Sequence, residues 1–166
     1  LESTPVTAIG EHVYPGTCRH LPPDVAATGP FALRVRVDDA TIGFTDRVQG
    51  PQAQDLARDL GDFVIRRSDK LHAYQLAVVV DDAAQGINSV VRGADLLAST
   101  PRQIFLQRAL HAITPEYLHV PVAVDENGHK LSKQTLARAL DAHDPLPALR
   151  AAWRFLGQPD ADAAHA

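Results

Sequence analysis

The chain has 166 residues, of which 45% are hydrophobic and 22% are charged, and its formal net charge is -4. This composition is typical of a globular protein, and the acidic balance argues against non-specific coating of nucleic acid without excluding a local basic face. A single cysteine excludes an internal disulfide and fits a reducing compartment, and no apolar run reaches the roughly 18 residues of a membrane-spanning helix.

The N-terminal part of the chain, up to about residue 30, is rich in proline, glycine and threonine. Its strongest local signal is Tyr14-Pro15-Gly16-Thr17, where proline sets φ and glycine accepts a positive φ, so a tight turn is predicted. The sequence holds no methionine and opens with Leu1-Glu2-Ser3. We therefore expect the chain to be part of a longer protein.

Three short strands are predicted in the next segment. Residues 31–37 alternate between apolar side chains and arginines, as a strand with one buried face does. Residues 41–45 are predicted to pair with that strand, and residues 63–66 form a third apolar run.

The segment from Tyr74 to Gly86 carries two conflicting signals. Three consecutive valines favour a strand, whereas apolar residues close to helical spacing and a glycine suited to a C-cap favour a helix. The residues alone leave both structures open. Residues 87–91 are then predicted as a strand that ends at Arg92-Gly93.

A clear helix is predicted to follow, with Thr100 as its N-cap, Pro101 at the first helical position and Gln103 completing a capping box. Residues 120–124 alternate as a further strand. A last helix is predicted from Asp144-Pro145 to a stop at Gly157. Strand, helix, strand, basic loop and helix together predict half of an α/β nucleotide-binding fold, preceded by a β-rich lobe.

The most informative motif is the pentapeptide Lys130-Leu131-Ser132-Lys133-Gln134. Two ammonium groups beside a hydroxyl can hold nucleotide phosphates and neutralise the charge that develops when a phosphate bond breaks. The alternative is a lysine-rich turn that is simply solvated. Arg92 follows a predicted strand at the edge where open α/β sheets bind ligands, and its alternative is an ion pair with Asp95 or exposure to solvent.

Tyr14 and Cys18 suggest a metal site only in part. A zinc site needs about four ligands, and the chain offers no second cysteine and no His-x-x-x-His pair. Tyr74 either packs in the core or faces a ligand. The adjacent carboxylates Asp81-Asp82 point to different faces, so a solvated or capping role is the simpler interpretation.

Together these motifs resemble the glutamyl-Q tRNA(Asp) synthetases, which are short paralogues of glutamyl-tRNA synthetase among the class I aminoacyl-tRNA synthetases. The resemblance runs in order from about residue 14 to residue 159. It is carried by Tyr14-x3-Cys18-Arg19, Tyr74-Gln75-Leu76-Ala77-Val78-Val79-Val80-Asp81-Asp82, Gln85-Gly86, Val91-Arg92-Gly93-Ala94-Asp95-Leu96, the lysine pentapeptide and Phe155-Leu156-Gly157-Gln158.

The resemblance implies a role for each matching residue. Tyr74 and Arg92 would contact bound glutamate. Lys133, with Ser132 and Lys130 beside it, would bind ATP and stabilise the departing pyrophosphate. Two further residues, Tyr14 and Cys18, would be two of four zinc ligands.

The implied fold is α/β, the second half of a class I synthetase Rossmann fold. Residues 1–62 would form a zinc-lobe or β-rich insertion, residues 63–127 the Rossmann half, and residues 128–166 the lysine signature loop with C-terminal helices. The resemblance also places a helix over residues 78–85. The family's Cys-x-Cys zinc ligands, its His-x-Gly phosphate loop and its early glutamate-binding arginine are absent from this sequence, so the chain alone is expected to be inactive.

The implied function is ATP-dependent activation of glutamate to glutamyl-adenylate and transfer to queuosine in the anticodon loop of tRNA(Asp). The partners would be glutamate, ATP and tRNA(Asp), for a cytoplasmic monomer without membrane contact. Two alternatives stay open. One is a truncated discriminating glutamyl-tRNA synthetase, and the other is a non-catalytic fragment that lacks the N-terminal half of the site.

Overall fold

The computed structural model describes residues 12–22, 30–125, 127–131 and 139–159. The chain is a mixed α/β structure with two compact units, one made of Leu1–Val91 with Leu96–His119 and the other of Arg92–Asp95 with Val120–Ala166. No helix in these described ranges is both long and apolar enough to cross a membrane. The elements in chain order are β1 (Leu33–Val35), β2 (Thr41–Asp46), β3 (Gly50–Asp55), α2 (Leu56–Asp59), β4 (Phe63–Arg66), α3 (Tyr74–Ala84), β5 (Ser89–Gly93), the 3-10 helix η1 (Ala94–Ser99), α4 (Thr100–Ala109), β6 (Glu116–Val120) and α5 (Leu146–Phe155).

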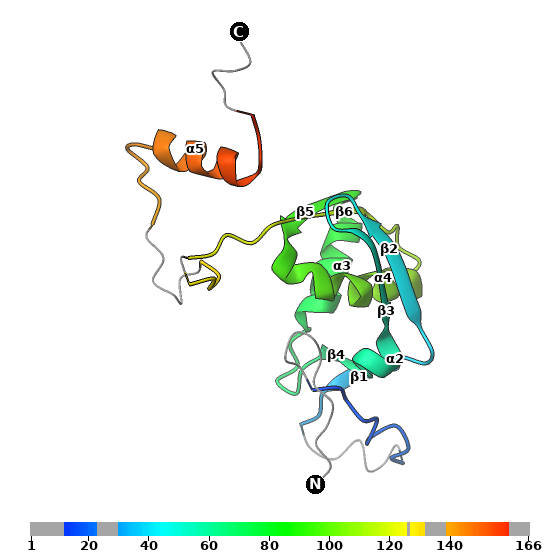
Figure 1. Ribbon diagram of the computed structural model, residues 1–166. Helices are drawn as coiled ribbons and strands as arrows, with labels where there is room; N and C mark the ends of the chain where they lie inside the picture. The colour runs from blue at the N-terminus through cyan, green and yellow to red at the C-terminus, as the bar shows by residue number, and fades with distance from the viewer. Residues whose placement is uncertain (1–11, 23–29, 126, 132–138, 160–166) are drawn as a thin grey trace. The chain divides into compact units, whose positions relative to one another are not determined.

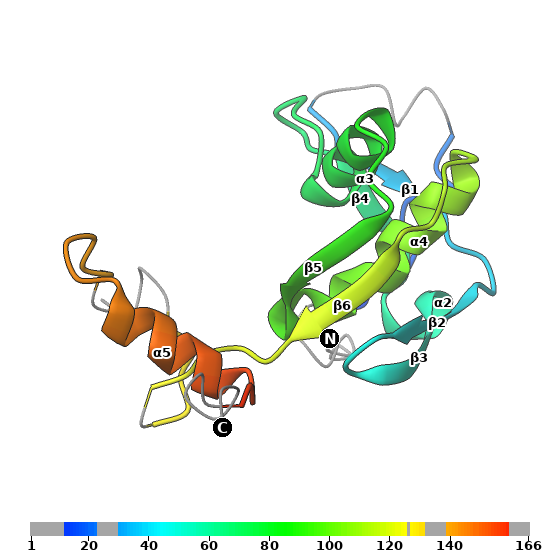
Figure 2. The ribbon, with the colours of Figure 1, turned by 90° about the horizontal axis from the view of Figure 1, so that it is seen from above.

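A four-stranded sheet with the order β3-β2-β6-β5 is the centre of the first unit. Strand β2 runs antiparallel to β3 and parallel to β6. Figure 2 shows β5 and β6 side by side with their arrows in the same direction. Because η1 and α4 connect these two strands, they form a β-α-β crossover, which is the building block of nucleotide-binding α/β folds.

The core of this unit lies where α4 packs on β2 and on α3, which also contacts β4 (Figure 1). Each fully buried leucine or isoleucine contributes about 1.5–3 kcal/mol relative to an exposed one. The buried hydrophobic residues are Val37, Ile42, Leu56, Leu60, Phe63, Val79, Ile104, Leu106 and Tyr117.

The predicted pairing of residues 31–37 with residues 41–45 is wrong. Strand β1 covers only Leu33–Val35 and pairs antiparallel with β4, while β2 pairs with β3. The reason is the tight connection between β2 and β3, where Gly50 has a φ of 73° and the Asp46 carboxylate accepts the N–H groups of the turn. This connection makes β3 the immediate partner of β2. Strand β3 was not predicted, because it contains Pro51 and two glutamines where a typical strand has apolar residues.

Helix α3 settles the ambiguity between Tyr74 and Gly86 in favour of a helix. It begins at Tyr74, four residues earlier than the resemblance implied. Gly86, with a φ of 68°, ends it, and the N–H of Ile87 donates to the Asp82 carbonyl at 2.9 Å. This left-handed glycine with a six-to-one hydrogen bond is a Schellman ending, as the C-cap signal predicted.

The predicted cap of α4 is wrong. Residues 94–99 are already a 3-10 helix, so Ser99 is the N-cap residue and makes no side-chain cap. Thr100 and Gln103 are both buried, and their side chains serve tertiary contacts instead. The Thr100 Oγ1 lies 3.4 Å from Nε2 of His119, and the Gln103 amide bonds to Gln75.

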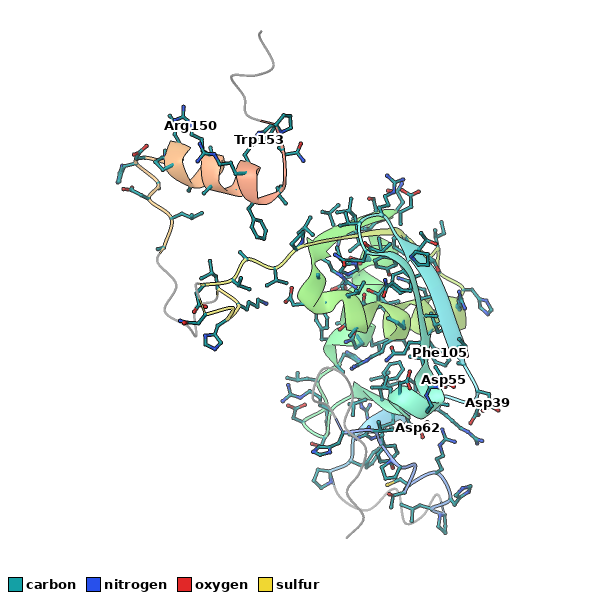
Figure 3. The ribbon with its side chains drawn as sticks, viewed as in Figure 1. Asp39, Asp55, Asp62, Phe105, Arg150 and Trp153 are labelled. Atoms are coloured by element: carbon teal, nitrogen blue, oxygen red, sulfur yellow. The ribbon has the colours of Figure 1, made fainter. Side chains whose placement is uncertain are left out.

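Of the last two predicted elements, the strand is shifted and the helix is confirmed. Strand β6 spans Glu116–Val120, about four residues before the predicted 120–124, because Pro121 follows it. Helix α5 spans Leu146–Phe155 within the predicted bounds and is followed by Gly157 with a φ of 67°. Figure 3 shows Arg150 and Trp153 extending from this helix.

Gly61 gives the fold a sharp test. Its φ is 72°, and a Cβ built there would lie 2.3 Å from the Tyr14 carbonyl oxygen. We expect Gly61→Ala to lower the free energy of unfolding by about 3 kcal/mol or more, because backbone must move. Gly50→Ala is the matched control, since its φ is 73° with nothing within 4 Å, and it should cost only about 1 kcal/mol. Equal losses in chemical unfolding of the full-length protein would contradict the clash.

Candidate functional site

Tyr74 is the first residue of α3 and is 52% exposed. The preceding residue, Ala73, donates its N–H to the Ile65 carbonyl at 2.9 Å, which ties the helix start to the end of β4. The interpretation of Tyr74 as a core residue is therefore wrong, and its phenol is open to a ligand.

Arg92 lies near the end of β5 and is half-buried. At the next residue, Gly93, a Cβ would lie 2.4 Å from Oδ1 of Asp95, so a larger residue there would displace the Asp95 carboxylate. This glycine lets the Asp95 carboxylate turn back toward the strand end. The described part of the second unit thus begins with a guanidinium and a carboxylate three residues apart.

Lys130 joins the strand end to the signature hairpin. Its Nζ lies 2.5 Å from Oδ2 of Asp95, within the second unit. Side-chain exposures of 53% for Lys130 and 34% for Asp95 mean that solvent screens this pair, so its free-energy contribution is at most about 1 kcal/mol. The ion pair matters mainly for geometry, because it holds Lys130 next to Asp95, which lies 35 residues earlier in the sequence.

The hairpin before the signature is built by Asp125. Its carboxylate accepts the N–H groups of Asn127 and His129, both at 2.9 Å, and its carbonyl accepts the N–H of Gly128. Gly128 has a φ of 81°, which explains the glycine. The predicted turn is confirmed, and it delivers Lys130 at the first position of the pentapeptide. Ser132 and Lys133 lie outside the described residues, so their phosphate-binding role stays a prediction.

Tyr14 and Cys18 are brought together by the turn that the sequence predicted. The backbone N–H of Cys18 donates to the Tyr14 hydroxyl oxygen at 2.8 Å, and Cys18 is exposed and forms no disulfide. A hydrogen bond with the Cys18 side chain, together with desolvation, raises the pKa of Tyr14.

Oxygen and sulfur donors at one point suit zinc, which binds thiolates and anionic oxygen. Within residues 12–22, 30–125, 127–131 and 139–159, however, no group of three or more His, Cys, Asp or Glu could hold a metal ion. Tyr14 and Cys18 therefore fit half of a zinc site, and a tetrahedral site would need further ligands.

Asp62 organises the surroundings of Tyr14, and sequence reasoning missed it. Its two carboxylate oxygens accept from Nε and one terminal nitrogen of Arg19 at 2.7 and 2.6 Å. The hydrogen bond from Arg19 holds the pKa of Asp62 below its usual value. Arg34 donates to the Asp62 carbonyl at 2.7 Å and stacks 4.0 Å from the centre of the Tyr14 ring. No signal short of the contact itself could have singled out Asp62.

A cavity of 280 Å³ extends from Tyr14 toward the start of α3. Its lining includes Arg34, Arg102 and Gln75, the neighbour of Tyr74. Two guanidinium groups and an amide can recognise a carboxylate or a phosphate. The first unit therefore places the Tyr14 turn and the residue beside Tyr74 on one polar cavity, whereas Arg92 and Lys130 belong to the second unit.

The chain belongs to a family of class I synthetases. Residues 7–154 match the family described as tRNA synthetases class I (E and Q), catalytic domain. The α/β fold and the sequence motifs described above agree with this assignment.

Particular relatives narrow the comparison. The chain is 62% identical over 147 residues to the glutamyl-Q tRNA(Asp) synthetase of Cupriavidus metallidurans, covering 87% of this chain and 46% of that protein. It is 60% identical over 147 residues to the glutamyl-Q tRNA(Asp) synthetase of Burkholderia cenocepacia, covering 87% and 48%. The chain thus spans about half the length of these curated relatives.

Solved structures agree on the fold. The glutamate-tRNA synthetase of Elizabethkingia anophelis has a TM-score of 0.63 and 25% identity, over 75% of this chain and 28% of that one. A glutamate tRNA ligase from Elizabethkingia meningosepticum, in complex with its amino acid, gives the same values. The predicted fold class, part of a class I synthetase, is confirmed.

Proposed function

We propose that the full-length protein containing this chain activates glutamate with ATP and transfers the glutamyl group to queuosine in tRNA(Asp), as a cytoplasmic monomer. Family membership supports a synthetase-type ligase, and the names of relatives about 60% identical support the particular reaction. The single observation that carries the proposal is the Lys130–Asp95 ion pair, because it joins the Arg92 segment to the lysine signature.

In the proposed first step, a carboxylate oxygen of glutamate attacks the α-phosphorus of ATP. A new oxygen–phosphorus bond forms, the bond to the β-phosphate oxygen breaks, and pyrophosphate leaves with that electron pair. Tyr74 and Arg92 would orient the glutamate, so that part of the acceleration comes from positioning. The queuosine base would then take the glutamyl group, with AMP as the leaving group.

The two lysines of the signature have different proposed roles. An ammonium group aimed at the departing pyrophosphate stabilises charge that develops only in the transition state. Lys130 already pairs with Asp95, so part of its charge is offset before any phosphate binds. We therefore assign the main role to Lys133, with Ser132 as a hydrogen-bonding partner of the phosphates and Lys130 as the assisting cation.

Zinc is proposed as a structural metal of the full-length protein. Tyr14 and Cys18 would supply two of its ligands once the phenol and thiol have lost their protons. Bound there, zinc would cross-link the Tyr14 turn to the rest of its lobe. The Arg19–Asp62 pair supports the same turn from inside the lobe, because Arg19 also donates to the Val37 carbonyl at 2.7 Å.

Charging assays test the proposed function. The full-length protein should attach labelled glutamate to tRNA(Asp) that carries queuosine, and should fail on tRNA(Asp) that lacks it and on tRNA(Glu). Attachment to tRNA(Glu) would instead identify a discriminating glutamyl-tRNA synthetase. No glutamate-dependent ATP–pyrophosphate exchange at all would leave only the non-catalytic alternative.

A further inference from the structure

The direction of the Tyr74 side chain depends on where α3 begins. The phenol is exposed and forms no hydrogen bond with another described residue. Its position is therefore fixed through the backbone of the first helical turn. A displacement of that turn would move the phenol by the same amount.

The first turn of α3 has no local cap. Its N-cap residue is Ala73, which has no polar side chain, and no acidic residue occupies the first turn. A helix start without such groups is held less firmly than one with a serine, threonine or aspartate cap. Something other than a cap must hold this end of the helix.

Gln75 supplies a side-chain anchor beside the backbone hydrogen bond from Ala73 to Ile65. Its Oε1 accepts from Nε2 of Gln103 at 2.9 Å, and its own Nε2 donates to the Ser99 hydroxyl at 3.1 Å. Gln103 is 2% exposed and Ser99 is the N-cap of α4, so both partners sit on the packed helix of the crossover. Both ends of the Gln75 amide are thus tied to the junction between η1 and α4.

We propose that Gln103 and Gln75 are positioning residues for the amino-acid substrate, acting through Tyr74. The inference rests on the proposed function, in which Tyr74 contacts glutamate. Loss of the Gln103 amide leaves the Gln75 amide half-buried without its donor, and the first turn of α3 then shifts to rehydrate it. Misplacement of a contact residue by about 1 Å is enough to weaken a site strongly.

The test compares two glutamines on one helix. Gln103→Leu removes the anchor, and Gln107→Leu is the control, because Gln107 is 3% exposed and its side-chain amide donates to the Tyr117 hydroxyl at 2.9 Å, away from Gln75. In ATP–pyrophosphate exchange by the full-length protein, Gln103→Leu should raise the KM for glutamate about tenfold and leave the KM for ATP unchanged. Gln107→Leu should lower thermal stability without changing either constant.

Equal changes in the KM for glutamate in both variants would overturn the proposal, since general loosening of α4 would then explain them. Ser99→Ala, a smaller change, should raise the same constant to a lesser degree and provides the measurement if Gln103→Leu does not fold. An unchanged KM in Ser99→Ala and Gln103→Leu alike would also overturn it.

The double variant separates this inference from the proposed function. If Tyr74→Ala raises the KM for glutamate, Gln103→Leu should add nothing further in the Tyr74→Ala background, because the two act through one contact. Additive effects would refute the positioning role and leave the function intact. An unchanged KM in Tyr74→Ala would refute the role of Tyr74 and the inference together.

Discussion

Asp46→Ala is expected to lower the free energy of unfolding by about 3–5 kcal/mol, because it removes the carboxylate that the buried His119 ring and several backbone N–H groups contact. Asp46 is 1% exposed and His119 is fully buried, with Nδ1 of His119 at 2.6 Å from Oδ2 of Asp46. The other carboxylate oxygen accepts the N–H groups of Val48, Gln49 and His119 at 2.9–3.2 Å. Alanine leaves the buried His119 N–H without this acceptor, whereas the N–H groups of Val48 and Gln49 are only part-buried.

An exposed pair between the same two strands provides the control. Arg47 directly follows Asp46, and Glu116 is the first residue of β6. Their side chains are 61% and 62% exposed, respectively. Glu116→Ala should therefore change the free energy of unfolding by no more than about 1 kcal/mol. Urea unfolding of the full-length protein, followed by circular dichroism, measures both variants. A loss for Asp46→Ala no larger than that for Glu116→Ala would refute the buried network.

The same carboxylate gives stability a dependence on pH. Burial acts to raise the pKa of Asp46, but the hydrogen bonds from Gln49 and His119 outweigh it and lower the pKa from 3.8 to about 2. A folded-state pKa below the unfolded value contributes stability above pH 4 that is lost as pH falls through 2. This contribution is about 2 kcal/mol. Asp46→Asn should flatten the stability profile between pH 4 and pH 2.

Sequence patterns predicted the elements whose signals are local. The Schellman glycine Gly86, the apolar run of β4 and the turn at Asp125 all specify structure within a few residues, and the structure confirms each. The predicted capping box at Thr100 and Gln103 was local too, but it failed. Both side chains are used across the core, and a preceding 3-10 helix takes over the start of α4.

Contacts distant in sequence could not be predicted in the same way. The His119 ring meets Asp46 from 73 positions away, and Lys130 meets Asp95 from 35. Without the structure, Asp46 and Asp95 could each be interpreted as an ordinary surface carboxylate. The motifs singled out Tyr74, Arg92 and the two lysines as candidates, whereas the contacts of Gln75 with Gln103 and of Lys130 with Asp95 emerged only from the structure.

Lys133→Ala is expected to slow glutamate-dependent ATP–pyrophosphate exchange by the full-length protein by about 10²–10³-fold. The ammonium group would neutralise charge on the departing pyrophosphate, so its removal should lower kcat more than it raises the KM for ATP. The midpoint of thermal unfolding should not change. An exchange rate equal to that of the unaltered protein would remove Lys133 from the mechanism.

Variants of Lys130 and Asp95 test whether Lys130 stabilises phosphate charge or only holds the signature hairpin in place through its ion pair. Both Lys130→Ala and Asp95→Asn break the ion pair, but only the first removes positive charge from the site. An assisting cation predicts that Lys130→Ala slows exchange about tenfold while Asp95→Asn has a smaller effect, since the Lys130 charge then stays in the site. Equal losses, with no further loss in the double variant, would show that the pair only holds the signature hairpin against the Arg92 segment.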